Sequence, residues 1–425
     1  MSADCLVSNR RSQGLEEIFQ RLNQRRAELA LILIQRLIET NADRKEMQGH
    51  LAIVWEAIQT SDVSFERALN VGDAEYYRTL LKLLFLGLRV HASADDQVDL
   101  NFRASTRLRD SESVMPIIVE LLERVVAIGM RDLATFIHDK PAEANPEDIG
   151  LITGILQACL RVPGIEFYYT QIVHMFSAND TARVATTLFS WSDNLAIDGD
   201  PVYGELSMLF LLELSTMPSM AEQLAIDGIL GNIGAANITA YLRRGNISPF
   251  ADSAGIQRCY SIWVRGILPL LLNVLDAVGD SIGTEVALFV NQFPNLLKQS
   301  SEAFDTGETS RTVTKGSTKH IAYSTCSEVH SIALIIYILN GFGVSGVAEI
   351  PEVKWDANNV AENVEFWLTA RAVLKDRILP MGGRDLALRK QVRENSGFSN
   401  KLEEKIVGEL MGIRDVLTEM NGGGS

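Results

Sequence analysis

Residues 258–278 read RCYSIWVRGILPLLLNVLDAV, and this stretch decides the fold class. At 100° per residue its polar side chains fall within a strip about 120° wide, and the rest of the circumference is apolar. A helix that is apolar over most of its circumference needs neighbours on several sides. Pro269 is expected to kink this helix, because proline removes one backbone hydrogen bond. The polar residues are Arg258, Ser261, Arg265, Asn273 and Asp276.

Apolar residues recur at helical spacing along nearly the whole chain, which predicts amphipathic helices throughout. The segment 281–299 is expected to be one helix with Pro294 in its interior. The first helix is expected to pack through a stripe consisting of Leu15, Ile18, Phe19, Leu22, Leu29, Leu33 and Leu37. Further helices are predicted at 44–60, 74–90, 112–129, 146–161, 181–195, 203–217, 320–340, 357–378 and 400–420.

The last predicted helix has signals at both ends. Asn400 followed by Glu403 fits a capping box, and Asn421-Gly422 fits a helix end. The expected buried stripe is Leu402, Ile406, Leu410, Ile413 and Leu417. The opposite face is expected to be solvated, as in the end helix of a repeat stack. That face carries Glu403, Glu404, Lys405, Glu409, Arg414 and Asp415.

The length of the chain indicates an extended stack. It has 425 residues, more than the roughly 250–300 that one core serves. The helices pair into units of about 40–47 residues, the size of HEAT or armadillo repeats. We therefore predict an all-α, right-handed α-solenoid of HEAT/armadillo-like repeats. The expected parts are a solenoid at 1–304, a Thr/Ser-rich loop at 305–319, helices at 320–420 that cap the same solenoid, and a flexible tail at 421–425.

Charge and cysteine content narrow the class of protein. The net charge of −15 disfavours direct nucleic-acid binding, because phosphates repel an acidic surface. Four dispersed cysteines favour a reducing compartment. No signal peptide is apparent at the start. The apolar runs 260–278 and 329–344 are interpreted as buried helices, since the first contains Arg265 and Asp276 and the second is shorter than a membrane span.

The residues that could carry chemistry do not form a recognisable site. Residues 341–346, GFGVSG, match the dinucleotide pattern G-x-G-x-x-G, but Pro351 prevents the helix that should follow. We interpret them as a glycine-rich helix end and loop. Cys326 and His330 share a helix face near His320, yet zinc needs about four ligands and no second pair exists. The remaining histidines are isolated: His50, His91, His138 and His174. We predict no catalytic, cofactor or metal site, and no enzyme activity.

Residues 258–279, followed by EVALFVNQFPNLL at 285–297 and SEAF at 301–304, resemble the C-terminal region of the 188-kilodalton scaffold nucleoporin family of the nuclear pore inner ring. The resemblance implies an α-helical superhelix and a scaffold role at the nuclear pore in the nuclear envelope. It implies binding to the inner-ring linker scaffold nucleoporin and to phenylalanine–glycine repeats. A karyopherin-like transport receptor, or another helical-repeat adaptor, is the alternative use of the same architecture.

Overall fold

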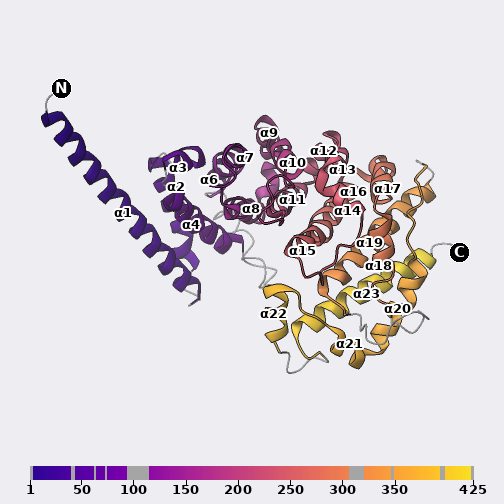
Figure 1. Ribbon diagram of the computed structural model, residues 1–425. Helices are drawn as coiled ribbons and strands as arrows, with labels where there is room; N and C mark the ends of the chain where they lie inside the picture. The colour runs from indigo at the N-terminus through magenta and orange to yellow at the C-terminus, as the bar shows by residue number, and fades with distance from the viewer. Residues whose placement is uncertain are drawn as a thin grey trace. The chain divides into compact units, whose positions relative to one another are not determined.

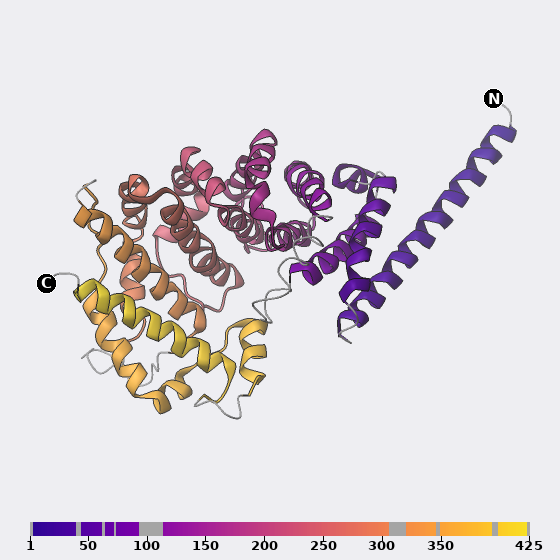
Figure 2. The same ribbon diagram turned by 180° about the vertical axis from the view of Figure 1, so that it is seen from behind.

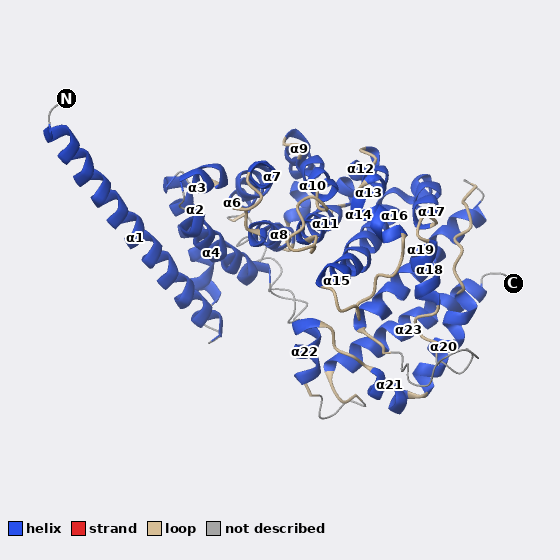
Figure 3. Cartoon of the chain, in the orientation of Figure 1, coloured by secondary structure: helices blue, strands red, loops and turns tan. Residues whose placement is uncertain are grey.

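The computed structural model describes residues 3–39, 44–61, 64–71, 74–92, 114–305, 320–345, 349–392 and 398–422. Within these ranges the regular structure is helical, and the only pairings of extended backbone are isolated bridges (Figure 3). Of the loop predicted at 305–319, residues 306–319 lie outside the described residues, and so do residues 423–425 of the tail predicted at 421–425. The chain divides into two compact units, Met1–Ala185 and Thr186–Ser425. Each unit is described by itself.

The first unit is built around α4 (Ala74–Ala92). Helices α1 (Ala3–Glu39), α2 (Arg44–Ser61) and α8 (Pro146–Leu160) all pack against it. Arg78 of α4 ties it to α8, because its Nε lies 2.6 Å from Oδ1 of the buried Asp148. The unit also contains α3 (Phe65–Val71), α6 (Met115–Leu121), the π-helix η2 (Leu122–Ile128), α7 (Gly129–Asp139), η3 (Ile165–Tyr168) and α9 (Tyr169–Ala178). Helix α10 (Thr181–Ser190) crosses the boundary between the units.

The second unit is a succession of helices in which helices a few elements apart along the chain pack on one another (Figures 1 and 2). Helix α16 (Leu268–Val278) packs on α12 (Pro218–Ile226) and α19 (Tyr323–Ser345), and α19 packs in turn on α23 (Lys401–Gly422). This order of packing is that of an all-α solenoid. Its helices are α11 (Val202–Ser215), α12 (Pro218–Ile226), α13 (Ile229–Ala235), α14 (Asn237–Arg243), α15 (Ala254–Ser261), η4 (Ile262–Ile267), α16 (Leu268–Val278), η5 (Gly279–Ile282), α17 (Gly283–Val290), α18 (Pro294–Ser301), α19 (Tyr323–Ser345), α20 (Ala357–Thr369), α21 (Arg371–Arg377), α22 (Gly382–Lys390) and α23 (Lys401–Gly422).

The apolar circumference predicted around 258–278 is confirmed, and the irregularity near Pro269 takes a specific form. The turn before the proline is a π-helix, η4, in which the N–H of Leu268 bonds to the carbonyl of Trp263. Pro269 has no N–H to donate, so a regular α-turn there would lack one backbone hydrogen bond. The wider π-turn therefore costs less at this position than it would elsewhere in a helix. Buried side chains on this helix are Ile262, Trp263, Ile267, Leu268, Leu271 and Leu275.

Two segments predicted as single helices are broken. Pro294 does not kink a helix, because α17 ends at Val290 and Pro294 occupies the first turn of α18. The missing N–H of proline costs nothing at that position. The segment 357–378 breaks at Ala370, which leaves the α conformation between α20 and α21. At both breaks the chain changes direction between two helices, although the apolar spacing of the sequence predicts a single helix.

The predicted stripe of the first helix is wrong from Ile18 to Leu33, while the side chain of Leu15 lies outside the described residues. In α1 the exposed fractions of Ile18, Phe19 and Leu29 are 62%, 60% and 57%. The residues that the rest of the unit buries are Ala27 and Ile34, on the opposite side of the helix. Helix α1 is apolar on two faces, and spacing alone does not tell which of them packs on α4.

The capping box of α23 is confirmed, while its solvated face is only half correct. Asn400 Oδ1 accepts from the N–H of Glu403 at 3.0 Å, and Glu403 Oε2 accepts from the N–H of Ser399 at 2.8 Å. This cap buries Glu403, which is 2% exposed. Farther along, Arg414 and Asp415 are exposed as expected. The predicted apolar stripe from Leu402 to Leu417 is buried.

Two helical stretches among the described residues have the length and apolar composition that a membrane span requires. They are Ala254–Val290 and Tyr323–Gly343, and 56% and 50% of their most apolar windows are buried inside the protein. The pair Pro146–Leu160 and Ile165–Ala178, bent by 106°, would be a third if it formed one span. Helix α16, which belongs to the stretch Ala254–Val290, packs on α19, which belongs to the stretch Tyr323–Gly343.

Candidate functional site

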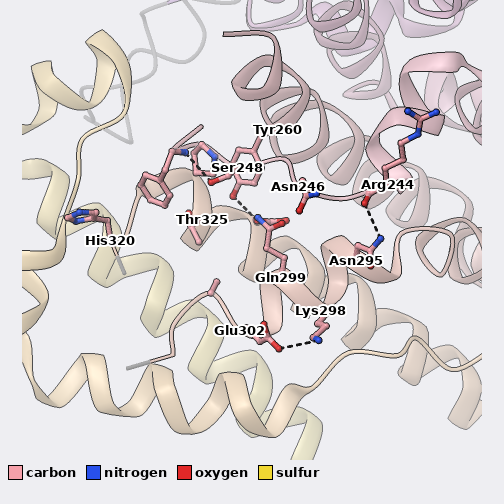
Figure 4. A pocket seen from close by; sticks show the side chains of 14 residues that line it. Arg244, Asn246, Ser248, Tyr260, Asn295, Lys298, Gln299, Glu302, His320 and Thr325 are labelled. Atoms are coloured by element: carbon pink, nitrogen blue, oxygen red, sulfur yellow. Dashed lines mark hydrogen bonds and ion pairs between the residues drawn. The ribbon is translucent and has the colours of Figure 1, made fainter. Parts of the chain in front are cut away.

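A cavity of about 600 Å³ opens in the second unit beside α18 and the start of α19 (Figure 4). One wall is the connection between α14 and α15, which contributes Arg244, Asn246 and Phe250. Helix α18 supplies the facing wall, and Glu328 of α19 lies at the inner end. The cavity is therefore lined by segments far apart in the sequence.

Hydrogen bonds from α18 hold the connecting wall in place. Asn295 Nδ2 donates to the carbonyl oxygens of Arg243 and Arg244 at 3.3 and 3.2 Å, and Gln299 Nε2 donates to that of Ile247 at 2.8 Å. Gly245 lies between them with φ of +74°, and a Cβ there would be 2.7 Å from Cβ of Asn295. Only glycine fits this left-handed position at that distance. The wall is thus fixed before any ligand arrives.

The inner end of the cavity is a buried carboxyl group. Tyr260 Oη donates to Glu328 Oε2 at 2.6 Å, and Trp263 Nε1 donates to Oε1 at 3.0 Å. All three side chains are at most 2% exposed. Burial raises the pKa of Glu328 to about 7, although the two hydrogen bonds act in the opposite direction. The pKa of Tyr260 is raised as well, chiefly by burial, so its hydroxyl keeps the proton that it donates.

The mouth of the cavity presents amides, an aromatic edge and charges. Phe250 is 37% exposed, and its ring centroid lies 6.3 Å from that of His320. Lys298 Nζ lies 3.9 Å from Glu302 Oε1, and both side chains reach solvent (Figure 4). Side-chain amides can pair with the backbone of a peptide, and an aromatic edge can contact its apolar side chains. Groups of these kinds suit the binding of an extended segment.

The structure separates the residues that the sequence grouped as a potential metal site. Cys326 is fully buried, and burial raises the pKa of its thiol. His330 Nδ1 lies 2.6 Å from Glu409 Oε2, and Tyr323 Oη donates to Oε1 of the same carboxylate at 3.0 Å. Burial raises the pKa of Glu409, but these hydrogen bonds outweigh it and the net pKa is lowered. His320 lines the cavity instead.

The glycine pattern forms part of a helix, as predicted. Helix α19 continues through Gly341, Phe342 and Gly343 to Ser345, and Gly346 lies outside the described residues. No strand precedes the pattern within the described chain, so it lacks the strand–turn–helix setting of a dinucleotide site. Among the described residues, no group of three or more His, Cys, Asp or Glu side chains could hold a metal ion.

Sequence reasoning missed Glu328, the residue that joins three helical segments at the cavity. Its only signal is an acidic residue in a largely apolar helix, TCSEVHSIALIIYIL at 325–339. An acid in such a run is buried only when donors reach it, and its donors come from residues 65 and 68 positions earlier. The local sequence does not contain those partners.

Comparison with known proteins identifies the fold and the family. Residues 50–417 match the family described as "Nuclear pore protein NUP188 C-terminal domain". A solved structure, "Nup188(aa1445-1827) from Myceliophthora thermophila", superposes with a TM-score of 0.75 at 45% identity, covering 87% of this chain and 98% of that one.

Curated relatives agree with this match. The chain is 41% identical to nucleoporin NUP188 of Chaetomium thermophilum over 97% of its own length and 24% of that protein's. It is 27% identical to nucleoporin nup184 of Schizosaccharomyces pombe over 64% of its own length and 16% of that protein's. The chain thus spans about a quarter or less of the length of these relatives. It belongs to the Nup188 family of nuclear pore proteins and corresponds to the C-terminal domain of that family.

Proposed function

We propose that the chain is a helical segment of the nuclear pore scaffold that works by binding other nucleoporins. The observation that carries this proposal is the match to the Nup188 C-terminal domain over residues 50–417. The curated relatives are themselves nucleoporins. A stack of helices offers long surfaces for partner segments, which is the usual role of this architecture. The chain would act at the nuclear pore, in the nuclear envelope, and without catalysis.

The proposed partners are the inner-ring linker scaffold nucleoporin and phenylalanine–glycine repeats. The cavity of the second unit supports a role in holding an extended segment. It combines the exposed edge of Phe250 with the polar side chains of Asn246 and Lys298 at a wall fixed by α18. An apolar side chain of a partner would pack on Phe250 while its backbone pairs with polar groups nearby.

We further propose that the two apolar helical stretches, Ala254–Val290 and Tyr323–Gly343, belong to the protein core and do not span a membrane. Trp263 and Leu271 of the first stretch, and Val329 and Ile335 of the second, are at most 1% exposed inside the second unit. A span would have to expose these side chains to lipid and give up their packing. In a flotation experiment with vesicles, the chain is expected to stay in the protein fraction.

Fluorescence recovery in living cells tests the scaffold role. The chain fused to a fluorescent protein is expected at the nuclear rim, with recovery over many minutes after bleaching. A karyopherin-like receptor would instead recover within seconds and would also fill the nucleoplasm. Diffuse fluorescence without rim enrichment, for a fusion that is intact and folded, would contradict the proposal.

Binding in solution tests the cavity. Phe250→Ser is expected to weaken retention on immobilised phenylalanine–glycine repeats about fivefold or more, because it removes the aromatic edge. Ile226→Ser is the matched control, since Ile226 is an apolar residue of the same unit and is 78% exposed. Equal retention of both variants would remove the cavity from the proposal and leave the scaffold role to the cell experiment.

A further inference from the structure

Helix α1 carries a second apolar face that the described part of the chain leaves uncovered. One face holds Ala27 and Ile34, which are 6% and 8% exposed where α1 packs on α4. The outer face of α1 consists of Ile18, Phe19, Leu22, Leu29, Ile32 and Leu33, whose exposed fractions range from 43% to 62%. At 100° per residue these side chains fall within an arc of roughly 140°. A continuous apolar stripe of this kind marks an interaction site.

The same side of the helix is positively charged, although the whole chain carries −15. Between residues 18 and 39 there are four arginines and two glutamates. At 100° per residue Arg25, Arg26 and Arg36 lie inside the arc of the outer face, and none lies on the face toward α4. Arg25 and Arg36 pair with Glu28 and Glu39, yet 82% and 75% of their side chains stay exposed.

We propose that the outer face of α1 docks an amphipathic helix of another polypeptide, whose apolar stripe is flanked by Asp and Glu. A helix fits because apolar residues at 3-and-4 spacing form ridges that interlock with those of a second helix. Acidic flanks fit because they pair with the arginines within the stripe. The face runs from Ile18 to Leu33, a rise of 15 residue steps that corresponds to about 22 Å, or about four turns of a partner helix.

Two other occupants fit the charge pattern less well. A second copy of α1 would bring arginines of one outer face against those of the other, and like charges in contact are destabilising. A membrane surface would have to take up Arg25, Arg26 and Arg36 inside the apolar arc, whereas membrane-bound helices keep their cations on the polar face. This docking surface belongs to the first unit, whereas the cavity belongs to the second.

The test uses two synthetic peptides of about 24 residues, with leucines at 3-and-4 spacing. One has glutamates beside the leucines, and the other has lysines at the same positions. Fluorescence anisotropy with the full 425-residue chain is expected to show binding of the glutamate peptide only. Added salt should weaken that binding, because it screens the charge pairs. Equal affinity for the two peptides, or binding of neither, would overturn the proposal.

Variants of the outer face locate the binding. The double variant Leu29→Ser, Ile32→Ser is expected to bind the glutamate peptide at least about tenfold more weakly, which is equivalent to ~1.4 kcal/mol of binding free energy. Arg25→Glu with Arg26→Glu should reverse the preference toward the lysine peptide. Ile226→Ser is the control, and circular dichroism confirms that each variant keeps its helix content. An unaltered preference after the arginine reversal would refute the proposed charge pairing.

The same samples reveal the other occupants. Light scattering that shows a dimer, lost in the Leu29→Ser, Ile32→Ser variant, would assign the face to a second copy. Stronger binding to vesicles of phosphatidylcholine and phosphatidylserine than to the glutamate peptide would assign it to a membrane surface. A monomer that ignores the vesicles and binds the glutamate peptide through the outer face supports the proposal.

Discussion

The hydroxyl of Tyr260 and the carboxyl of Glu328 form a 2.6 Å hydrogen bond in a place where neither side chain is more than 2% exposed. The bond joins α15 to α19, and Trp263 completes it from η4. No ion pair with a cation is seen for Glu328 among the described residues, so burial favours the protonated carboxyl more than water does. The pKa of about 7 expresses that preference.

Glu328→Gln is expected to flatten the dependence of stability on pH. A pKa raised from 4.5 to about 7 means that the folded chain binds the proton more tightly than the unfolded chain does. Stability is therefore fully present below about pH 4.5 and falls as the pH rises to about 7, by an amount on the order of 3 kcal/mol. Urea titrations at intervals across this window measure the difference between the variant and the natural chain. Parallel curves would contradict the assignment.

Arg258→Met is expected to destabilise the second unit by about 2–3 kcal/mol. Arg258 Nε and Nη2 each donate to Asp200 at 2.9 Å, and Nη1 pairs with Glu205. Without the guanidinium, two partly buried carboxylates face each other. Thermal unfolding measures the loss. Adding Asp200→Asn and Glu205→Gln to the variant should recover part of it, and no recovery would show that the arginine acts through packing alone.

Gly266→Ala is expected to cost about 1–3 kcal/mol, because a Cβ there would clash with Cγ of the buried Met208. Gly408→Ala is the matched control. Gly408 lies in α23 with nothing within 4 Å of its added Cβ, so alanine should stabilise by about 0.5–1 kcal/mol. Met208→Ala combined with Gly266→Ala should cost less than the sum of the two, which a double-mutant cycle in urea would measure.

Asn400→Ala is expected to cost about 1 kcal/mol by removing the acceptor that caps α23. Asn400→Asp keeps an oxygen at that position and should unfold within a few tenths of a kcal/mol of the natural chain. Hydrogen exchange of the Glu403 amide gives a local measurement of the same cap. Equal protection in both variants would mean that packing alone fixes the start of α23.

The sequence alone predicts which side chains are buried wherever a helix has a single apolar face. The apolar circumference around Trp263 and the stripe from Leu402 to Leu417 are buried as expected. The cap at Asn400 is local and could be found from its spacing. The glycine pattern at Gly341 was correctly assigned to a helix end because Pro351 excluded the alternative.

Features that depend on distant partners could not be predicted. Glu403 looks like a solvated residue but is buried, because it caps its own helix and lies 3.6 Å from Lys375. Helix α1 has two faces that are both rich in apolar residues. Which of them is buried depends on where α4 packs, and the spacing within α1 does not contain that information. The cavity depends on Glu328 finding donors on α15 and η4, which lie far from it in the chain.

The hydrogen bonds on either side of residues 306–319 have a consequence for changes in the length of the chain between them. Asp305 Oδ1 accepts from Asn359 Nδ2 at 3.0 Å, and the N–H of Ile321 donates to the carbonyl of Arg377 at 2.9 Å. Both ends of the segment are thus anchored by residues outside it. Doubling the length of a connection between anchored ends costs only about 0.6 kcal/mol. A change in the number of residues between Asp305 and His320 therefore leaves both anchoring hydrogen bonds in place, because their donors and acceptors all lie outside residues 306–319.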